Sequence, residues 1–273
     1  MMSVRRGNAR RVDTAHHWSY GIVMDERARG LTTFAPGVWL ATDPVRILGT
    51  HLGATMAVVE LADDELLVFS PVALTPERKA TVQALGTVAH LYAPNTYHFM
   101  WLAEWAAAFP EARVHGPQAL GDKRPDLRLD RLHDRDPLGA LSQTLDEVHI
   151  DGFLLEESVL VHRPSKTLLV ADLVHNIGRP QHWWTKTYSR MMGFYDRVAL
   201  SRVLRWTAFR DPAAARRSLA RLATCDFDRL VVGHGQPLEN GARNALEAAY
   251  RWLPEKRALA LPPPRVSRRS YCG

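Results

Sequence analysis

Short runs of apolar residues, each ended by a turn, recur along the chain from residue 31 to residue 258. Apolar runs of about four to eight residues predict β-strands, here at 37–41, 56–61, 66–70, 88–93 and 112–115. The acidic turn 63–65 joins the second and third runs, so these two are expected to form a hairpin. Thr75 before Pro76 and Glu77 has the pattern of a helix N-cap and first turn. The aromatic-rich stretch 98–109 is expected to be the next helix.

The second half of the chain repeats this alternation of strands and helices. The runs 158–162 and 167–171 are separated by four polar or turn residues, which predicts another hairpin. Helices are expected at 211–223 and 240–252, on either side of the strand that leads to His234. Two strand-rich halves, each with its own helices, predict an α/β protein built as a four-layer αββα sandwich.

The two ends of the chain differ from this body in composition. Residues 1–30 are polar and Arg-rich, which predicts a flexible basic arm, and residues 259–273 read as a Pro/Arg-rich tail. Seven arginines of these ends exceed the whole net charge of +6, namely Arg5, Arg6, Arg10, Arg11, Arg265, Arg268 and Arg269. The predicted domain, residues 31–258, is therefore close to neutral, and this argues against a nucleic-acid partner.

The lengths of the apolar runs and the number of cysteines also indicate the cellular location. No apolar run reaches the roughly 18 residues that a membrane span needs, and no signal-peptide pattern opens the chain. The two cysteines, Cys225 and Cys272, are too few for a disulfide framework. A reducing, cytoplasmic location is therefore expected.

One segment, 183–206, is unusually rich in aromatic residues. It is most simply a pair of buried helices. The same composition suits a hydrophobic lid over a substrate or a surface through which two copies form a homodimer.

Three residues with metal-ligating side chains each follow the end of a predicted strand: His98, Asp172 and His234. The last of them lies between Gly233 and Gly235, after the apolar run 230–232. Strand ends of α/β folds meet at one edge, where ligands bind. Two imidazoles and one carboxylate suit zinc, iron or manganese, and zinc is the ion we favour.

Each of the three residues also has a structural interpretation. His98 could cap a helix or pack as an aromatic, and Asp172 could cap the turn after its strand. His234 could hydrogen-bond directly to Asp172 with no metal between them.

Four further residues are candidates for the surrounding pocket: Glu157, His162, His175 and Asn176. Glu157 is a candidate general base. His162 lies on a predicted strand, which favours a core position, whereas His175 and Asn176 follow Asp172 in a loop that could face a substrate.

In their order along the chain, these motifs resemble the metallo-β-lactamase fold superfamily, and more closely a divergent branch of it. The resemblance covers about residues 34–253 and rests on the segments 36–39, 69–72, 93–98, 162–168, 171–176 and 227–235. It implies the αββα sandwich with a metal site at one edge, and a small molecule as substrate.

The chain departs from the metal motif of that superfamily, H-x-H-x-D-H. The matching stretch, 94–99, lacks the first two histidines, His98 stands at the aspartate position, and Phe99 replaces the last histidine. A later histidine of the family falls near Leu154 or Leu155, beside Glu156 and Glu157. Asp172 matches the bridging aspartate, and His234 matches the final histidine.

The resemblance thus implies that one of two metal subsites is lost and that His98, Asp172 and His234 keep the other. A single-metal hydrolase with Asp172 as its catalytic carboxylate is the favoured function, acting on an ester, amide, thioester or phosphodiester. Two alternatives stay open: a metal-free binding protein on the same scaffold, and an iron-dependent redox enzyme.

Overall fold

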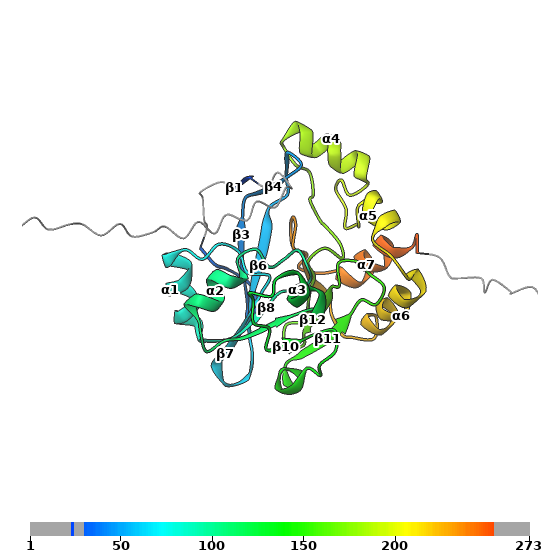
Figure 1. Ribbon diagram of the computed structural model, residues 1–273. Helices are drawn as coiled ribbons and strands as arrows, with labels where there is room; N and C mark the ends of the chain where they lie inside the picture. Colours follow the sequence, from blue (N-terminus) through cyan, green and yellow to red (C-terminus); the bar gives the residue numbers. More distant parts are fainter. Residues whose placement is uncertain (1–22, 25–29, 254–273) are drawn as a thin grey trace, which may run out of the picture.

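The computed structural model describes residues 23–24 and 30–253, so most of the predicted basic arm and the whole predicted tail lie outside the described residues. Two sheets pack face to face in the described part (Figure 1). The larger sheet has the order β10-β9-β8-β7-β6-β3-β2. Its strands are β2 (Thr32–Ala35), β3 (Val38–Asp43), β6 (Ala54–Glu60), β7 (Glu65–Phe69), β8 (Thr87–Tyr92), β9 (Arg113–Gly116) and β10 (Arg131–Leu132).

The smaller sheet has the order β11-β12-β13-β14. Its strands are β11 (Leu145–His149), β12 (Ser158–His162), β13 (Thr167–Leu169) and β14 (Arg229–Val231). A third, short sheet joins β4 (Val45–Ile47) to β5 (Thr50–His51) and to β1 (Val23–Met24), two residues of the predicted arm. Short 3₁₀ turns lie at η1 (Ala62–Asp64) and η2 (Gly139–Gln143).

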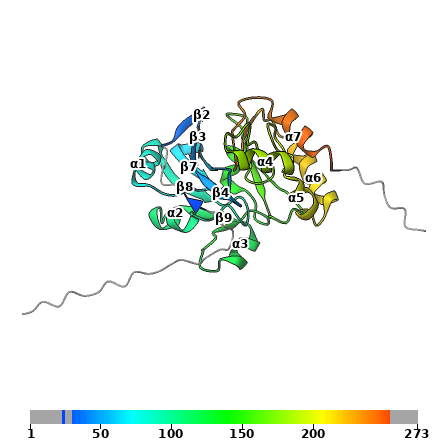
Figure 2. The ribbon, with the colours of Figure 1, turned by 90° about the horizontal axis from the view of Figure 1, so that it is seen from above.

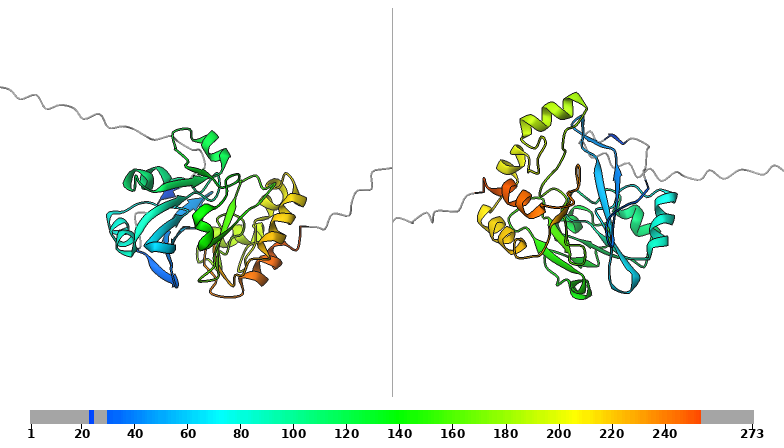
Figure 3. Two further views of the ribbon diagram at one scale, coloured as in Figure 1. Left: turned by 90° about the horizontal axis from the view of Figure 1, so that it is seen from below. Right: turned by 180° about the vertical axis from the view of Figure 1, so that it is seen from behind.

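Helices cover the outer faces of both sheets. Seen from above and from below, α1 (Pro76–Leu85) and α2 (Leu102–Ala108) lie outside the larger sheet, and α6 (Pro212–Leu222) and α7 (Ala242–Tyr250) lie outside the smaller one (Figures 2 and 3). The short α3 (Gln118–Lys123) follows β9, whereas α4 (Trp183–Met192) and α5 (Arg202–Thr207) stand at one end of the molecule. The four-layer αββα sandwich expected from the sequence is therefore present.

Alternation along the strands explains these layers. On β6, Met56 and Val58 pack toward α1 and α2, whereas Ala57 and Val59 pack between the two sheets. Successive strand residues point to opposite faces, so a strand that is apolar throughout is buried on both. The inter-sheet core is completed from the smaller sheet, with Leu160, Leu169 and Val231 among its members.

Most of the predicted elements are confirmed, and two predictions need correction. The Thr75 hydroxyl accepts a hydrogen bond from the Arg78 amide, as expected of an N-cap, and β12 and β13 form the predicted hairpin. The predicted helix 98–109 is wrong over its first turn, because the structure has a turn over 98–101 and α2 begins only at Leu102. There the Asn95 side chain accepts the amide protons of Tyr97 and His98, which is the bonding pattern of a helix N-cap, but the residues that follow form only turns before α2.

The second correction concerns the aromatic segment. Two helices, α4 and α5, do form within 183–206, but they are not buried as a pair, since Trp183 is 70% exposed and Trp206 is 86% exposed. Among the residues described, no helix has the length and apolar character needed to cross a membrane.

Candidate metal centre

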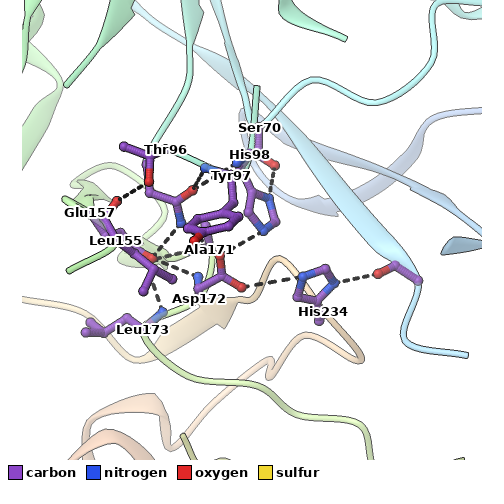
Figure 4. A network of polar contacts seen from close by, with 12 residues as sticks. Ser70, Thr96, Tyr97, His98, Leu155, Glu157, Ala171, Asp172, Leu173 and His234 are labelled. Carbon is purple, nitrogen blue, oxygen red and sulfur yellow. Dashed lines mark hydrogen bonds and ion pairs between the residues drawn. The ribbon is translucent and has the colours of Figure 1, made fainter. Parts of the chain in front are cut away.

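Three strand ends deliver the predicted residues to one edge of the sandwich. β13 and β14 are parallel neighbours, with Leu169 paired to Val231, and Asp172 and His234 follow them. His98 comes from the opposite sheet, on the segment after β8. The structure therefore brings together three side chains that are far apart in the sequence (Figure 4).

The three side chains face one another through their ligating atoms. His98 Nε2 lies 3.3 Å from Asp172 Oδ2, and His234 Nε2 lies 3.5 Å from Asp172 Oδ1. One ligand atom from each residue lies within 4.8 Å of the other two. The side chains are almost enclosed, with exposed fractions of 8% for His98, 11% for Asp172 and 9% for His234.

The Nδ1 atom of each imidazole, which points away from Asp172, has a hydrogen-bond partner. His234 Nδ1 donates to the carbonyl of Gly53 at 2.6 Å, which leaves Nε2 facing Asp172 as the nitrogen that can bind an ion when the ring is neutral. His98 Nδ1 lies 2.8 Å from the Ser70 hydroxyl. Metal-binding histidines are commonly oriented in this way, by a hydrogen bond from the nitrogen that does not bind the ion.

The glycines beside His234 are required by close approach. A Cβ on Gly233 would lie 2.6 Å from His98 Cε1 and 2.7 Å from the Ala171 carbonyl oxygen. A Cβ on Gly235, which has a φ of +105°, would lie 2.1 Å from the Asn176 carbonyl oxygen. Only glycine lets this segment pass so close to its neighbours.

Asp172 is held from behind by Asn95 and Glu157. The Asn95 amide nitrogen donates to Glu157 Oε2 and to Asp172 Oδ2, each at 3.0 Å. The Glu157 carboxylate also accepts the backbone amide protons of Ala171, Asp172 and Leu173, at 2.8 to 3.2 Å. Glu157 has no exposed surface, so its side chain positions Asp172 rather than facing solvent.

Charges in the site follow from burial and from these partners. Burial acts to raise the pKa of Asp172, but the imidazoles of His98 and His234 outweigh it, and the pKa lies well below its usual range. For His234, burial acts to lower the pKa, yet the hydrogen bond and charge of Asp172 raise it overall. Burial and the Asp172 charge raise the pKa of Glu157 to about 7.

The remaining predicted pocket residues lie at different distances from the centre. The buried ring of His175 packs against His234, with ring centroids 5.6 Å apart; its Nδ1 has no hydrogen-bond partner among the described residues. Burial is the main cause that lowers the pKa of His175 to about 4. Asn176 donates to the Gln236 carbonyl at 2.8 Å and so ties two loops together.

His162 lies away from the centre. It is the last residue of β12, at the opposite end of that strand from Glu157, and its Nδ1 contacts the Ser165 hydroxyl at 2.7 Å. This agrees with the core position that its strand pattern favoured.

Three supporting residues were not identified from the sequence: Gly53, Ser70 and Asn95. Asn95 could have been predicted from the sequence, because it follows the same strand as His98 and its side-chain amide therefore lies at the same edge of the sheet. Ser70 and Gly53 contact the site across 28 and 181 residues of sequence, and no local pattern marks such contacts.

The donor set fits a divalent ion. Two ligand atoms of a tetrahedral site, each about 2.1 Å from the ion, lie about 3.4 Å apart. The imidazole nitrogens lie 3.3 Å and 3.5 Å from different oxygens of Asp172, and one ligand atom from each of the three residues lies within 4.8 Å of the other two, so a small inward shift would bring the set to this value. The chemistry of two neutral imidazoles and an ionised carboxylate is that of zinc, iron and manganese sites.

Comparison with solved structures gives matches over most of the chain. A metallo-beta-lactamase from Pontibacter korlensis matches 83% of this chain and 99% of its own, with 14% identity and a TM-score of 0.58. The metallo-beta-lactamase FIM-1 from Pseudomonas aeruginosa, in its mono-zinc form, matches 85% of this chain and 96% of its own, with 12% identity and a TM-score of 0.58. The chain has the metallo-β-lactamase fold.

The metallo-β-lactamase fold is shared by proteins of different kinds. The metal-soaked Flv1 flavodiiron core from Synechocystis sp. PCC6803 matches 86% of this chain and 62% of its own, with 14% identity and a TM-score of 0.57. No family model and no curated protein matches the sequence. Identities this low establish the fold alone, so any function has to be argued from the geometry of the site.

Proposed function

We propose that this chain is a metal-dependent hydrolase with a single-ion site formed by His98, Asp172 and His234. One observation carries the proposal: two imidazoles turn their Nε2 atoms toward the two oxygens of one buried carboxylate. Their Nδ1 atoms are held from outside by Ser70 and Gly53. A site of three protein ligands leaves a position for water or substrate, as catalytic metal sites do.

The contacts of Asn95 and Glu157 support a site for one metal ion rather than two. Where the family motif has further metal ligands, the Asn95 amide bridges Glu157 and Asp172 with two hydrogen bonds of 3.0 Å. Both of its donors are thereby used. Hydrogen bonds, rather than a second ion, join these two carboxylates, which supports a single-ion site.

The roles of the protein groups can be stated from their contacts. A divalent ion held by the three residues supplies Lewis-acid chemistry for hydrolysis. Asp172 holds that position with an ionised carboxylate, because its pKa lies well below the usual range under the influence of the two imidazoles. Asn95 and Glu157 orient Asp172, and the small-molecule substrate approaches from the side that they do not occupy.

Zinc is the ion we propose, with iron and manganese as competitors for the same donors. A specific observation also favours a second candidate, a metal-free binding protein: His234 and Asp172 already form a buried ion pair that satisfies both groups. The likeness to a flavodiiron core keeps iron-dependent redox chemistry as a third.

Hydrolysis assays with defined ions separate these candidates. Chelator-treated protein is reloaded with zinc, iron or manganese and tested on a nitrophenyl ester, a thioester, an anilide and a bis-nitrophenyl phosphodiester. We expect zinc-dependent hydrolysis of at least one compound, and a loss of about 100-fold or more in kcat/KM for Asp172→Asn.

The matched control for this assay is His51→Ala, which removes a histidine outside the three and is expected to keep the rate. Hydrolysis that is equal with and without added ion would refute the metal-dependent mechanism. Turnover of oxidisable compounds with iron alone would favour the redox candidate instead.

A further inference from the structure

Exposed apolar side chains gather at the end of the molecule formed by α4, α5 and the turn between β4 and β5. Trp183 is 70% exposed and Trp206 is 86% exposed, and Leu48, Met191 and Val203 are each about half exposed or more. A contiguous group of large exposed apolar side chains marks an interaction site in proteins of this size. We call the surface formed by Leu48, Trp183, Arg190, Met191, Arg202, Val203 and Trp206 the α4–α5 face.

Contacts between the elements show that the three segments that carry the α4–α5 face are neighbours. Trp184 Nε1 donates to the Leu48 carbonyl at 3.1 Å, which holds the β4–β5 turn against the start of α4. Arg202 Nη1 donates to the Met191 carbonyl at 3.0 Å, which holds the start of α5 against the end of α4. Figure 1 and the view from behind in Figure 3 both place the two helices next to each other.

The helical spacing puts the exposed residues of α4 on one side. Trp183, Arg190 and Met191 are separated by seven and eight residues, so they share a helix face. Thr185 and Ser189 are fully buried on the opposite side. Thr185 Oγ1 accepts the His51 amide proton at 2.8 Å, which fixes the helix to β5. The outer side of α4 is thus presented to solvent by a fixed helix.

The charge of this region is strongly one-sided. Between residues 179 and 210 the only acidic residue is Asp196, which pairs with Arg179 at 2.7 Å. The same stretch has seven basic residues, namely Arg179, Lys186, Arg190, Arg197, Arg202, Arg205 and Arg210. The near-neutral domain expected from the overall charge therefore has a basic face at one end.

We propose that the α4–α5 face binds the surface of an anionic membrane. Tryptophan favours the headgroup region of a bilayer, and Leu, Met and Val side chains enter the boundary with the acyl chains. Arginines beside them attract anionic headgroups. The combination of exposed tryptophans, aliphatic side chains and unopposed arginines meets all three requirements. The proposal needs no metal and does not depend on the proposed hydrolase activity.

Two other occupants fit the face less well. A symmetric dimer through residues 183–206 would place the same basic patch on both sides of the interface, and like charges facing each other are unfavourable. Single-stranded nucleic acid would pair with the arginines and stack on the tryptophans. It would leave Leu48, Met191 and Val203 without a role.

Vesicle flotation with the full-length chain tests the proposal. Vesicles of phosphatidylcholine alone are compared with vesicles that contain about a third phosphatidylglycerol, at about 0.1 M and about 0.5 M salt. We expect binding to the anionic vesicles alone, weakened by salt. Both Trp183→Ala/Trp206→Ala and Arg190→Glu/Arg202→Glu are expected to bind at least about tenfold more weakly.

Matched controls separate this face from the rest of the chain. Met100→Ala removes an exposed apolar side chain elsewhere, and Arg128→Glu reverses a charge whose side chain is 90% exposed and lies near Asp130. Both controls are expected to bind like the wild type. The arginines outside the described residues are present in every variant, so a difference between variants reports on the face.

Three results would overturn the proposal. One is equal binding by the wild type and the double tryptophan variant, or no binding by either. Another is a wild-type dimer that Trp183→Ala/Trp206→Ala converts to monomer. The third is tight binding of an oligo-dT strand without binding to vesicles. Circular dichroism spectra identical to the wild type show that the variants are folded.

Discussion

At the scale of single residues, the centre depends on one carboxylate that never reaches solvent. Glu157 accepts four hydrogen bonds, from Asn95 and from three successive backbone amides. Successive amide protons that converge on one acceptor form an anion-binding nest. The nest fixes the backbone on both sides of Asp172, so the direction of the Asp172 side chain is set by a neighbour that was expected to act as a base.

Removal of Glu157 is expected to cost stability rather than only activity. Glu157→Ala leaves four buried donors unpaired, and we expect the free energy of unfolding to fall by about 3 kcal/mol or more. Urea denaturation measures the change. The matched control is Glu156→Ala, because Glu156 is one-third exposed and its nearest partner, His149, lies 3.6 Å away. We expect a loss below about 1 kcal/mol for the control; equal losses would contradict the positioning role.

The sequence was enough to predict that side chains converge where each follows a strand, but not where the partner is remote in sequence. His98, Asp172 and His234 all lie just past strand ends, and their convergence follows from the topology. The bond from His234 to Gly53 spans 181 residues. Such a contact depends on how the two sheets pack, and a pattern within a short window carries no trace of it.

At the scale of elements, a second group of buried histidines, distinct from the candidate metal ligands, lies on and beside β9 and β10. His115 on β9 and His133, just after β10, are both buried, and the ring of Tyr92 stacks on each of them. Burial, together with the positive charge of neighbours such as His90, lowers the pKa of His115 to about 2. Burial lowers the pKa of His133 to about 3, against a hydrogen bond to the Ala93 carbonyl.

These histidines make the fold sensitive to acid. In the unfolded chain a histidine has a pKa of about 6.5. Below that pH, His115 and His133 bind protons in the unfolded state but stay neutral in the folded state. Their contribution to stability is complete above pH 6.5 and falls as the pH decreases toward 3. Each histidine is expected to lower the free energy of unfolding by about 1.4 kcal/mol per pH unit in this range.

Urea denaturation between pH 7.5 and pH 5 measures this dependence. We expect His115→Gln to be less stable at pH 7.5, because a packed ring is lost. Its free energy of unfolding should also fall less steeply with decreasing pH, by the contribution of one histidine. A variant with the wild-type slope would contradict the assignment to His115.

Element boundaries show where local pattern was insufficient. The stretch 98–109 has helical composition and Asn95 makes the bonds of an N-cap to Tyr97 and His98, yet the chain forms turns over 98–101 and α2 begins only at Leu102. That delay leaves His98 on a turn, from which its ring reaches Asp172. His98, which lies outside the helix that its sequence pattern predicts, is therefore also a residue of the site.

At the scale of the whole molecule, the sandwich was predictable because strand alternation and helix caps agree with each other. Leu66 and Val68 face the outer helices, and Leu67 and Phe69 face the second sheet. Exposure of α4 and α5 was not predictable in the same way. Their aromatic residues are those of a buried helix, and only the three-dimensional arrangement shows that Trp183 and Trp206 point to solvent.

The arrangement of the whole chain separates two surfaces with different roles. The candidate centre lies just past the ends of β8, β13 and β14, and the α4–α5 face lies on helices outside the two sheets. The Thr185 bond to His51 and the His234 bond to Gly53 connect both regions to the same stretch of chain, 51–53. The two proposals can nevertheless fail independently, since one concerns an ion and the other a lipid surface.

The ion content of the purified protein tests the central claim most directly. We predict one ion per chain by elemental mass spectrometry, with zinc as the main metal, and less than about a tenth of this in Asp172→Ala and in His234→Ala. His51→Ala is expected to keep the full content. A wild type with no more metal than these two variants would contradict the single-ion site, and two ions per chain would contradict the role given to Asn95.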